Sequence, residues 1–176
     1  MRGVVVTLVT FCGAASALGD LCQVVQDGLP PRCNCSSEAL TATLTCRVVM
    51  LGTDEVDIKA DLFPCASVAH VDVVIMEQNH SQNLSIVDVR ANEKKRVAVP
   101  GLSVKVPHIG NIGVQATVEL SGGLRDMSLE VGLDACGVVR GHAFCGSEVT
   151  TKLPVTVIKA HHDLTGFCDD APAVVV

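Results

Sequence analysis

Cysteine is the residue type in this 176-residue chain with the most chemistry available to it, as nucleophile, metal ligand or disulfide partner. Of the nine cysteines, Cys12 lies in an apolar N-terminal stretch of the kind that is removed on export. The remaining eight form an even set, which in an exported chain is typical of disulfides. We therefore expect disulfide bonds at Cys22, Cys33, Cys35, Cys46, Cys65, Cys136, Cys145 and Cys168.

Two spacings restrict how these cysteines can pair. A bond between Cys33 and Cys35 would close a strained ring, so each of them should pair with another cysteine. Such a pair also occurs in metal sites, but an oxidising compartment favours disulfides, and we expect no metal and no cofactor. Cys136 and Cys145 bracket a segment that can turn back on itself, so we expect them to pair with each other. The spacing leaves the other pairings open.

His161, His162 and Asp163 are residue types that could hold a metal or carry out catalysis. On a strand, however, neighbouring side chains point to opposite faces, so the two imidazoles would converge only if the chain turned there. A solvated strand end is the favoured interpretation. Because the chain also lacks nucleophile-elbow, zinc-protease and phosphate-loop motifs, we expect no catalytic residues. A hydrolytic enzyme is the third hypothesis for function.

Three N-x-S sequons, at Asn34, Asn79 and Asn83, predict sites of N-glycosylation in an exported chain. Asn79 and Asn83 share the polar stretch 77–83 between two expected strands, so we expect a hairpin tip with glycan on at least one of them. Asn34 is less favourable, because the cysteines on both sides of it are expected in disulfides.

The N-terminus predicts export. Arg2 is followed by an apolar run, residues 3–13, and then by the small-residue pattern Ala15-Ser16-Ala17 that signal peptidase accepts. We predict a signal peptide over residues 1–17, with cleavage at residue 19 as the alternative, and a protein that is secreted or lies in the lumen of the secretory pathway. No later apolar run reaches the length of about 18 residues that a membrane span needs. We expect a flexible tail over residues 169–176.

Alternation of apolar and polar residues dominates the rest of the chain. Val56, Ile58, Ala60 and Leu62 alternate with acidic and basic residues, as expected of a half-buried strand. About nine such segments predict an all-β, antiparallel β-sandwich stapled by disulfides, with a flattened β-barrel as the alternative. Residues 39–168 should form the sandwich, and residues 18–38 an irregular segment tethered by disulfides. The expected strands are 40–50, 56–62, 68–76, 84–90, 95–99, 102–106, 113–120, 124–133 and 151–160.

Composition removes several classes of function. The formal net charge is −6, which disfavours nucleic acid as a partner. The chain contains no tryptophan and no tyrosine, so it lacks the aromatic platforms on which sugars and single-stranded bases stack. Lectin and RNA-binding functions are therefore disfavoured.

An apolar loop is the strongest hint of a binding site. Ile109 and Ile112 lie in the loop 107–113, and Leu102 and Val104 lie on the strand before it. Our first hypothesis is a non-enzymatic protein that binds a small apolar or lipid-like ligand between its sheets, with these four residues as contacts. In broad architecture the expected fold is similar to the MD-2-related lipid-recognition domains, also exported, disulfide-bonded sandwiches. In those domains a long stretch precedes the last cysteine, whereas 22 residues separate Cys145 from Cys168 here.

The second hypothesis is an extracellular protein-protein interaction or structural module with a solid core. Because the chain has no tryptophan and no tyrosine, which are common hot spots of protein interfaces, we expect such an interface to be polar and of modest affinity. A cavity between the sheets of a few hundred Å³ would favour the ligand, and a filled interior would favour the interaction module.

Overall fold

A computed structural model describes residues 21–25, 29–38, 40–50, 54–79, 81–106, 110–139, 142–148, 150 and 153–168. The predicted signal peptide and the predicted tail 169–176 lie outside these residues.

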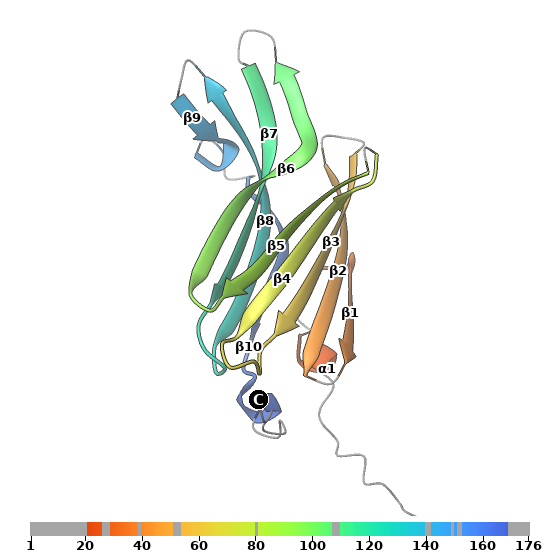
Figure 1. The fold of residues 1–176 in the computed structure, drawn as a ribbon, viewed down its shortest axis with the longest axis vertical. Helices are drawn as coiled ribbons and strands as arrows, with labels where there is room; N and C mark the ends of the chain where they lie inside the picture. The colour runs from red at the N-terminus through yellow and green to blue at the C-terminus, as the bar shows by residue number, and fades with distance from the viewer. Residues whose placement is uncertain are drawn as a thin grey trace, which may run out of the picture.

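Ten strands of the described residues form two antiparallel sheets that pack face to face (Figure 1). The first sheet has the order β1-β2-β3-β4-β5, and the second has the order β10-β8-β7-β6, with β9 pairing beside β8. The two sheets are separate, which confirms the β-sandwich and not the flattened barrel. The strands are β1 (Cys33–Glu38), β2 (Thr41–Met50), β3 (Asp54–Phe63), β4 (His70–Glu77), β5 (Gln82–Arg90), β6 (Glu93–Val106), β7 (Gly110–Ser121), β8 (Met127–Val139), β9 (His142–Cys145) and β10 (Val155–His162).

Three details differ from the sequence-based expectation. Residues 18–38 were expected to be irregular, but they contain a short helix, α1 (Leu21–Val25), and the edge strand β1. Strand β9 was not predicted. A break was expected at Pro100 and Gly101, whereas β6 continues through them with a register shift between Ala98 and Ser103. Because β6 is an edge strand, a proline there need not remove a hydrogen bond from the sheet, and Gly101 accommodates the irregularity with φ of 79°.

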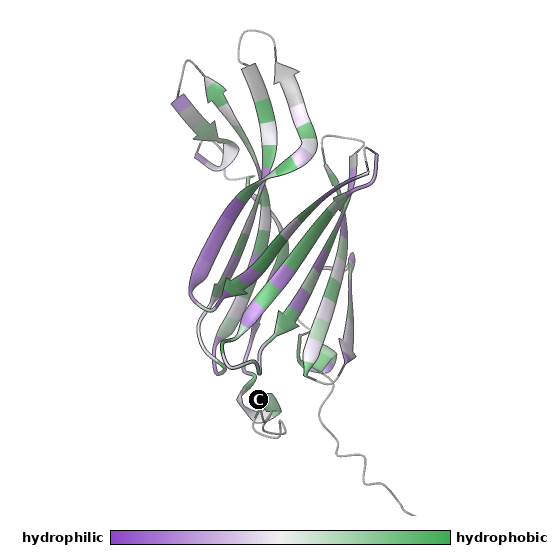
Figure 2. Ribbon diagram, viewed as in Figure 1, coloured by the Kyte–Doolittle hydropathy of each residue, from purple (hydrophilic) through white to green (hydrophobic). Residues whose placement is uncertain are grey.

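The space between the sheets is filled by aliphatic side chains. Along β4, residues alternate strictly between half-buried and buried, and Figure 2 shows the same alternation of hydrophilic and hydrophobic bands along the strands. A side chain with no accessible surface cannot border a void large enough for water, so the middle of the sandwich is packed. A pocket beside Leu129 has a volume of only about 10 Å³, far below the few hundred Å³ that a small-molecule ligand needs. The core side chains with no exposure include Leu44, Ile58, Ile75, Leu120, Leu133 and Ile158.

Four disulfides fasten the periphery to this core. Two of them attach α1 and β1 to the first sheet, which explains why a strand as polar as β1 forms. The third attaches the C-terminal helix α2 (Thr165–Cys168) to the segment after β3, across a sequence separation of 103. The expected Cys136–Cys145 pair is confirmed, as is the expectation that Cys33 and Cys35 pair elsewhere. The other three bonds are Cys22–Cys35, Cys33–Cys46 and Cys65–Cys168.

A lysine joins the two sheets along the edge that β5 and β6 share. The Lys95 ammonium on β6 donates hydrogen bonds to the carbonyl oxygens of Val87 and Asp88 on β5, each at 2.9 Å. The receiving segment is irregular: Asp88 has φ of 53°, and its N–H donates to a carboxylate oxygen of Asp72 at 2.7 Å. This edge of the sandwich is thus tied by a charged side chain.

The outer face of the first sheet carries a nearly buried carboxylate whose protonation should affect stability. Asp57 accepts hydrogen bonds from Arg47 Nε at 2.6 Å and Nη2 at 3.0 Å, and from Gln78 Nε2 at 2.8 Å. The hydrogen bond from Arg47 is the main cause that lowers the pKa of Asp57. Because the pKa is lower in the folded than in the unfolded protein, this carboxylate stabilises the fold above its unfolded pKa of about 3.9, and the stabilisation is lost as the pH falls further.

We expect the free energy of unfolding of the wild type to drop more between about pH 6 and about pH 3 than that of Asp57→Asn. Urea unfolding at both pH values measures the difference. Parallel losses in the two proteins would contradict this role of Asp57, and Glu38→Gln, at an exposed position of the same sheet, serves as the control.

Candidate functional site

Of the four predicted ligand contacts, the structure describes the side chains of Leu102 and Ile112. Leu102 is buried, and Ile112 is half-buried on β7, directly opposite Val104 in the β6–β7 pairing. The side chain of Val104 and the whole of Ile109 lie outside the described residues. Neither Leu102 nor Ile112 lines the hollow that the outer face of the second sheet presents.

This hollow has a volume of about 390 Å³ and lies over β6, β7, β8 and β9. The surface is depressed here because Gly113, which has no side chain, stands directly opposite Cys136, whose sulfur is bonded to Cys145 on the neighbouring strand β9. A second hollow of about 200 Å³ continues along the same face past Gly132, and Arg96 lines both. We call the larger one the Arg96 hollow.

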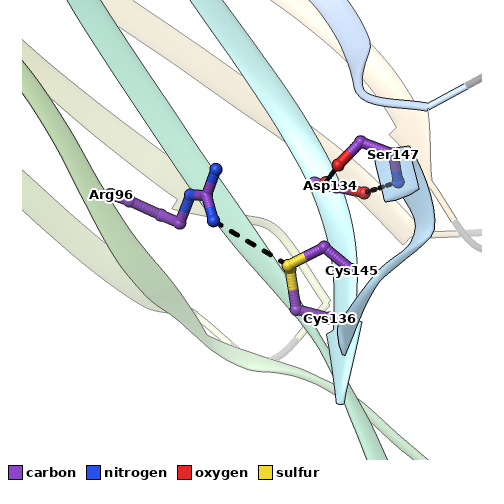
Figure 3. The surroundings of a disulfide bond; sticks show 5 residues. All are labelled: Arg96, Asp134, Cys136, Cys145 and Ser147. Atoms are coloured by element: carbon purple, nitrogen blue, oxygen red, sulfur yellow. Dashed lines mark hydrogen bonds between the residues drawn. A yellow bond between two sulfur atoms is a disulfide. The ribbon is translucent and has the colours of Figure 1, made fainter. Parts of the chain in front are cut away.

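Arg96 is a cation without an anionic partner among the described residues. Its guanidinium extends from β6 toward the disulfide, with Nη1 at 4.0 Å from Cys145 Sγ (Figure 3). Sulfur in a disulfide is a weak acceptor, so this contact positions the guanidinium without neutralising its charge. Arg32 and Arg125 likewise have no carboxylate within 4.0 Å among the described residues, but neither borders this hollow. Six other described cations each lie within 4.0 Å of a carboxylate: Arg47, Lys59, Arg90, Lys94, Lys95 and Lys159.

A buried carboxylate holds the far wall of the hollow in place. Asp134 on β8 is 3% exposed and accepts hydrogen bonds from the N–H of Ser147 at 3.2 Å and from its hydroxyl at 2.5 Å (Figure 3). These bonds fix the short helix η2 (Gly146–Glu148) against the sheet. A Cβ on Gly146 would lie 2.3 Å from the end of the Leu153 side chain, so a larger residue at this position would require that side chain to move. Glu148 is thereby placed at the rim of the Arg96 hollow.

Asp134, Cys136 and Cys145 bring three potential metal-ligand atoms within 4.8 Å of one another. The two sulfurs are bonded to each other, however, and a metal requires free thiolates. As long as the disulfide stands, this group is structural.

The histidine pair and its neighbouring aspartate lie at the end of β10. His161 and His162 are adjacent on β10, where His161 is exposed and His162 is half-buried. Asp163 accepts hydrogen bonds from the N–H of Thr165 at 3.0 Å and from its hydroxyl at 2.7 Å. The backbone hydrogen bond is the main cause that lowers the pKa of Asp163. Asp163 therefore caps α2.

Sequence reasoning missed the residues that define the hollow, namely Arg96, Gln115 and Glu148. The available signal was glycine at outward positions of otherwise alternating strands: Gly113 in β7 and Gly132 in β8 leave the sheet surface bare. That signal marks a depression but does not say which distant side chains border it.

No protein-family model, no curated protein and no solved structure matches the chain. Within the described part of the chain, no helix has the length and hydropathy needed to cross a bilayer. The geometry of the Arg96 hollow therefore carries the functional argument.

Proposed function

We propose that this protein is a secreted, non-enzymatic interaction module that recognises an extracellular protein through the outer face of its second sheet. The observation that carries the proposal is the Arg96 hollow, a concave surface bordered by a guanidinium that has no carboxylate partner among the described residues. An unpaired cation in a concavity is a group that a partner can satisfy.

The filled interior supports this second hypothesis over a ligand held between the sheets. The central side chains of both sheets have no accessible surface, which leaves no space of a few hundred Å³ beside them. A lipid between the sheets would need the core side chains to move apart, at the cost of their packing.

The functional groups around the hollow support binding over hydrolysis. They are the guanidinium of Arg96, the amide of Gln115 and the carboxylate of Glu148, beside a disulfide. These groups form hydrogen bonds and ion pairs, whereas a hydrolytic enzyme with a covalent intermediate needs a nucleophile next to a base.

Glycans at the three sequons would leave the outer face of the second sheet uncovered, because all three lie on the first sheet. Asn79 and Asn83 are exposed at the β4–β5 hairpin of the first sheet, and Asn34 is exposed on β1 of the same sheet (Figure 1). In our proposal at least one of Asn79 and Asn83 carries N-linked glycan. Protein secreted by a glycosylating host should lose mass after N-glycosidase treatment, and an unchanged mass would contradict this part of the proposal.

A site-specific cross-linking experiment tests the recognition face. A photoreactive residue replaces Gln115 in the hollow, and in a matched control it replaces Thr45, which is exposed on β2 of the first sheet. In the extracellular fluid of the native source, we expect a discrete protein adduct with the probe at residue 115 only. Equal adducts from both positions, or none from residue 115, would contradict the proposal, and a lipid that co-purifies in native mass spectra would favour the first hypothesis instead.

A further inference from the structure

We propose that the Arg96 hollow binds an extended peptide segment of the partner in which an acidic and a basic side chain lie two residues apart. This inference rests on the proposed function and names the chemistry that the hollow would recognise. It follows from two opposite charges that line one concavity without pairing with each other.

The acidic side chain would bind Arg96. A guanidinium is a planar fork that matches the two oxygens of a carboxylate, and such charge-assisted bonds are stronger than its contact with the Cys145 sulfur. The half-buried amide of Gln115 lies on the same face and can donate a further hydrogen bond. Lys94, also on β6, is already engaged by Glu119 at 2.8 Å and is not available for this role.

The basic side chain would bind Glu148. This carboxylate borders the same hollow, and no lysine or arginine of the described residues lies within 4.0 Å of it. The bonds from Ser147 to Asp134 hold the backbone of η2, and with it Glu148, beside the hollow. The hollow is therefore bordered by a cation and an anion, and a segment with both charges complements it better than a purely acidic one.

A spacing of two residues places both charges of an extended segment on the side that faces the hollow. In an extended segment, residues two apart point to the same side and lie about 7 Å from each other. Two charged side chains at that spacing can enter one hollow of about 390 Å³ together. A neighbouring apolar residue of the segment can rest on Val138, which is 56% exposed at the border of the hollow.

The test uses the full protein and three acetylated, amidated peptides: Leu-Ser-Asp-Ser-Lys, its Asp-to-Asn analogue and its Lys-to-Gln analogue. Peptide is titrated to about 10 mM, and backbone NMR shifts report the Kd and the location of binding. We expect shifts on β6, β7 and η2, and binding about threefold to tenfold weaker for each analogue.

Variants assign each charge of the peptide to its partner. In Arg96→Gln the Asp-to-Asn change should no longer matter, and in Glu148→Gln the Lys-to-Gln change should no longer matter. Lys94→Gln, on the same strand and face, is the matched control and should bind all three peptides as the wild type does.

Two results would overturn the inference: equal binding of all three peptides, or an effect of Lys94→Gln as large as that of Arg96→Gln. If the probe at residue 115 captures a partner but the peptide does not bind, the proposed function stands and the peptide chemistry is wrong. If neither experiment detects binding, both are wrong.

Discussion

Removal of the Cys65–Cys168 disulfide, by Cys65→Ser together with Cys168→Ser, should lower the free energy of unfolding by about 4 to 5 kcal/mol. The bond spans a sequence separation of 103, so in the unfolded chain it closes a long loop and removes much conformational freedom. In the folded protein it holds α2 against the segment after β3. Urea unfolding measures the loss, with peptide mapping to confirm that the other three bonds have formed.

The matched control is the double variant Cys136→Ser and Cys145→Ser. That bond has a sequence separation of only 9 and joins residues that the β8–β9 pairing already places opposite each other. Its removal should cost about 2.5 to 3 kcal/mol by the same loop argument. If the two double variants lose the same stability, loop length does not determine what these bonds contribute.

The second large effect is expected in the core. Leu133→Ala should lower the free energy of unfolding by about 2 to 5 kcal/mol, because Leu133 has no exposed surface and its strand β8 lies between β7 and β10. A packed centre cannot collapse around the missing atoms. Chemical denaturation of the variant measures the loss, and Val87→Ala, at a side chain that is 57% exposed, should change stability by less than about 0.5 kcal/mol.

This second experiment also bears on function. A loss below about 1 kcal/mol for Leu133→Ala would mean that the interior is loosely packed. A loosely packed interior would favour the hypothesis of a ligand between the sheets. It would also favour the ligand contacts predicted from the sequence, which include Leu102 and Ile112.

Much of the fold could be predicted from alternation, because the nine segments expected from it correspond to eight of the ten described strands. Strands β1 and β9 could not be predicted in this way. Strand β1 is polar along its length, and β9 is only four residues long; each is bonded through a disulfide to a residue directly opposite on the neighbouring strand. Disulfide bonds hold these two strands in place, so they can be predicted only when the pairing of the cysteines is known.

The candidate site was harder to predict for a different reason. Arg96 and Glu148 lie far apart in sequence, and each by itself is an ordinary charged residue of a strand or turn. They border one hollow because the strand register places Gly113 opposite Cys136 and because Asp134 holds η2 down. The apolar loop 107–113 stood out in the sequence, whereas Arg96 is distinguished by bordering a hollow without a carboxylate partner among the described residues, which only a structure reveals.

The lysine that ties β5 to β6 also bears on how copies of this protein behave toward one another. Free strand edges invite a second molecule to add its own strand, and this route leads to swapped dimers and aggregates. At this edge the ammonium of Lys95 already occupies the carbonyls of Val87 and Asp88, and the left-handed backbone of Asp88 interrupts the regular row of hydrogen-bonding groups. This flank is therefore a poor template for strand addition by a second molecule, whereas the Arg96 hollow lies on the outer face of the second sheet, away from the strand edges.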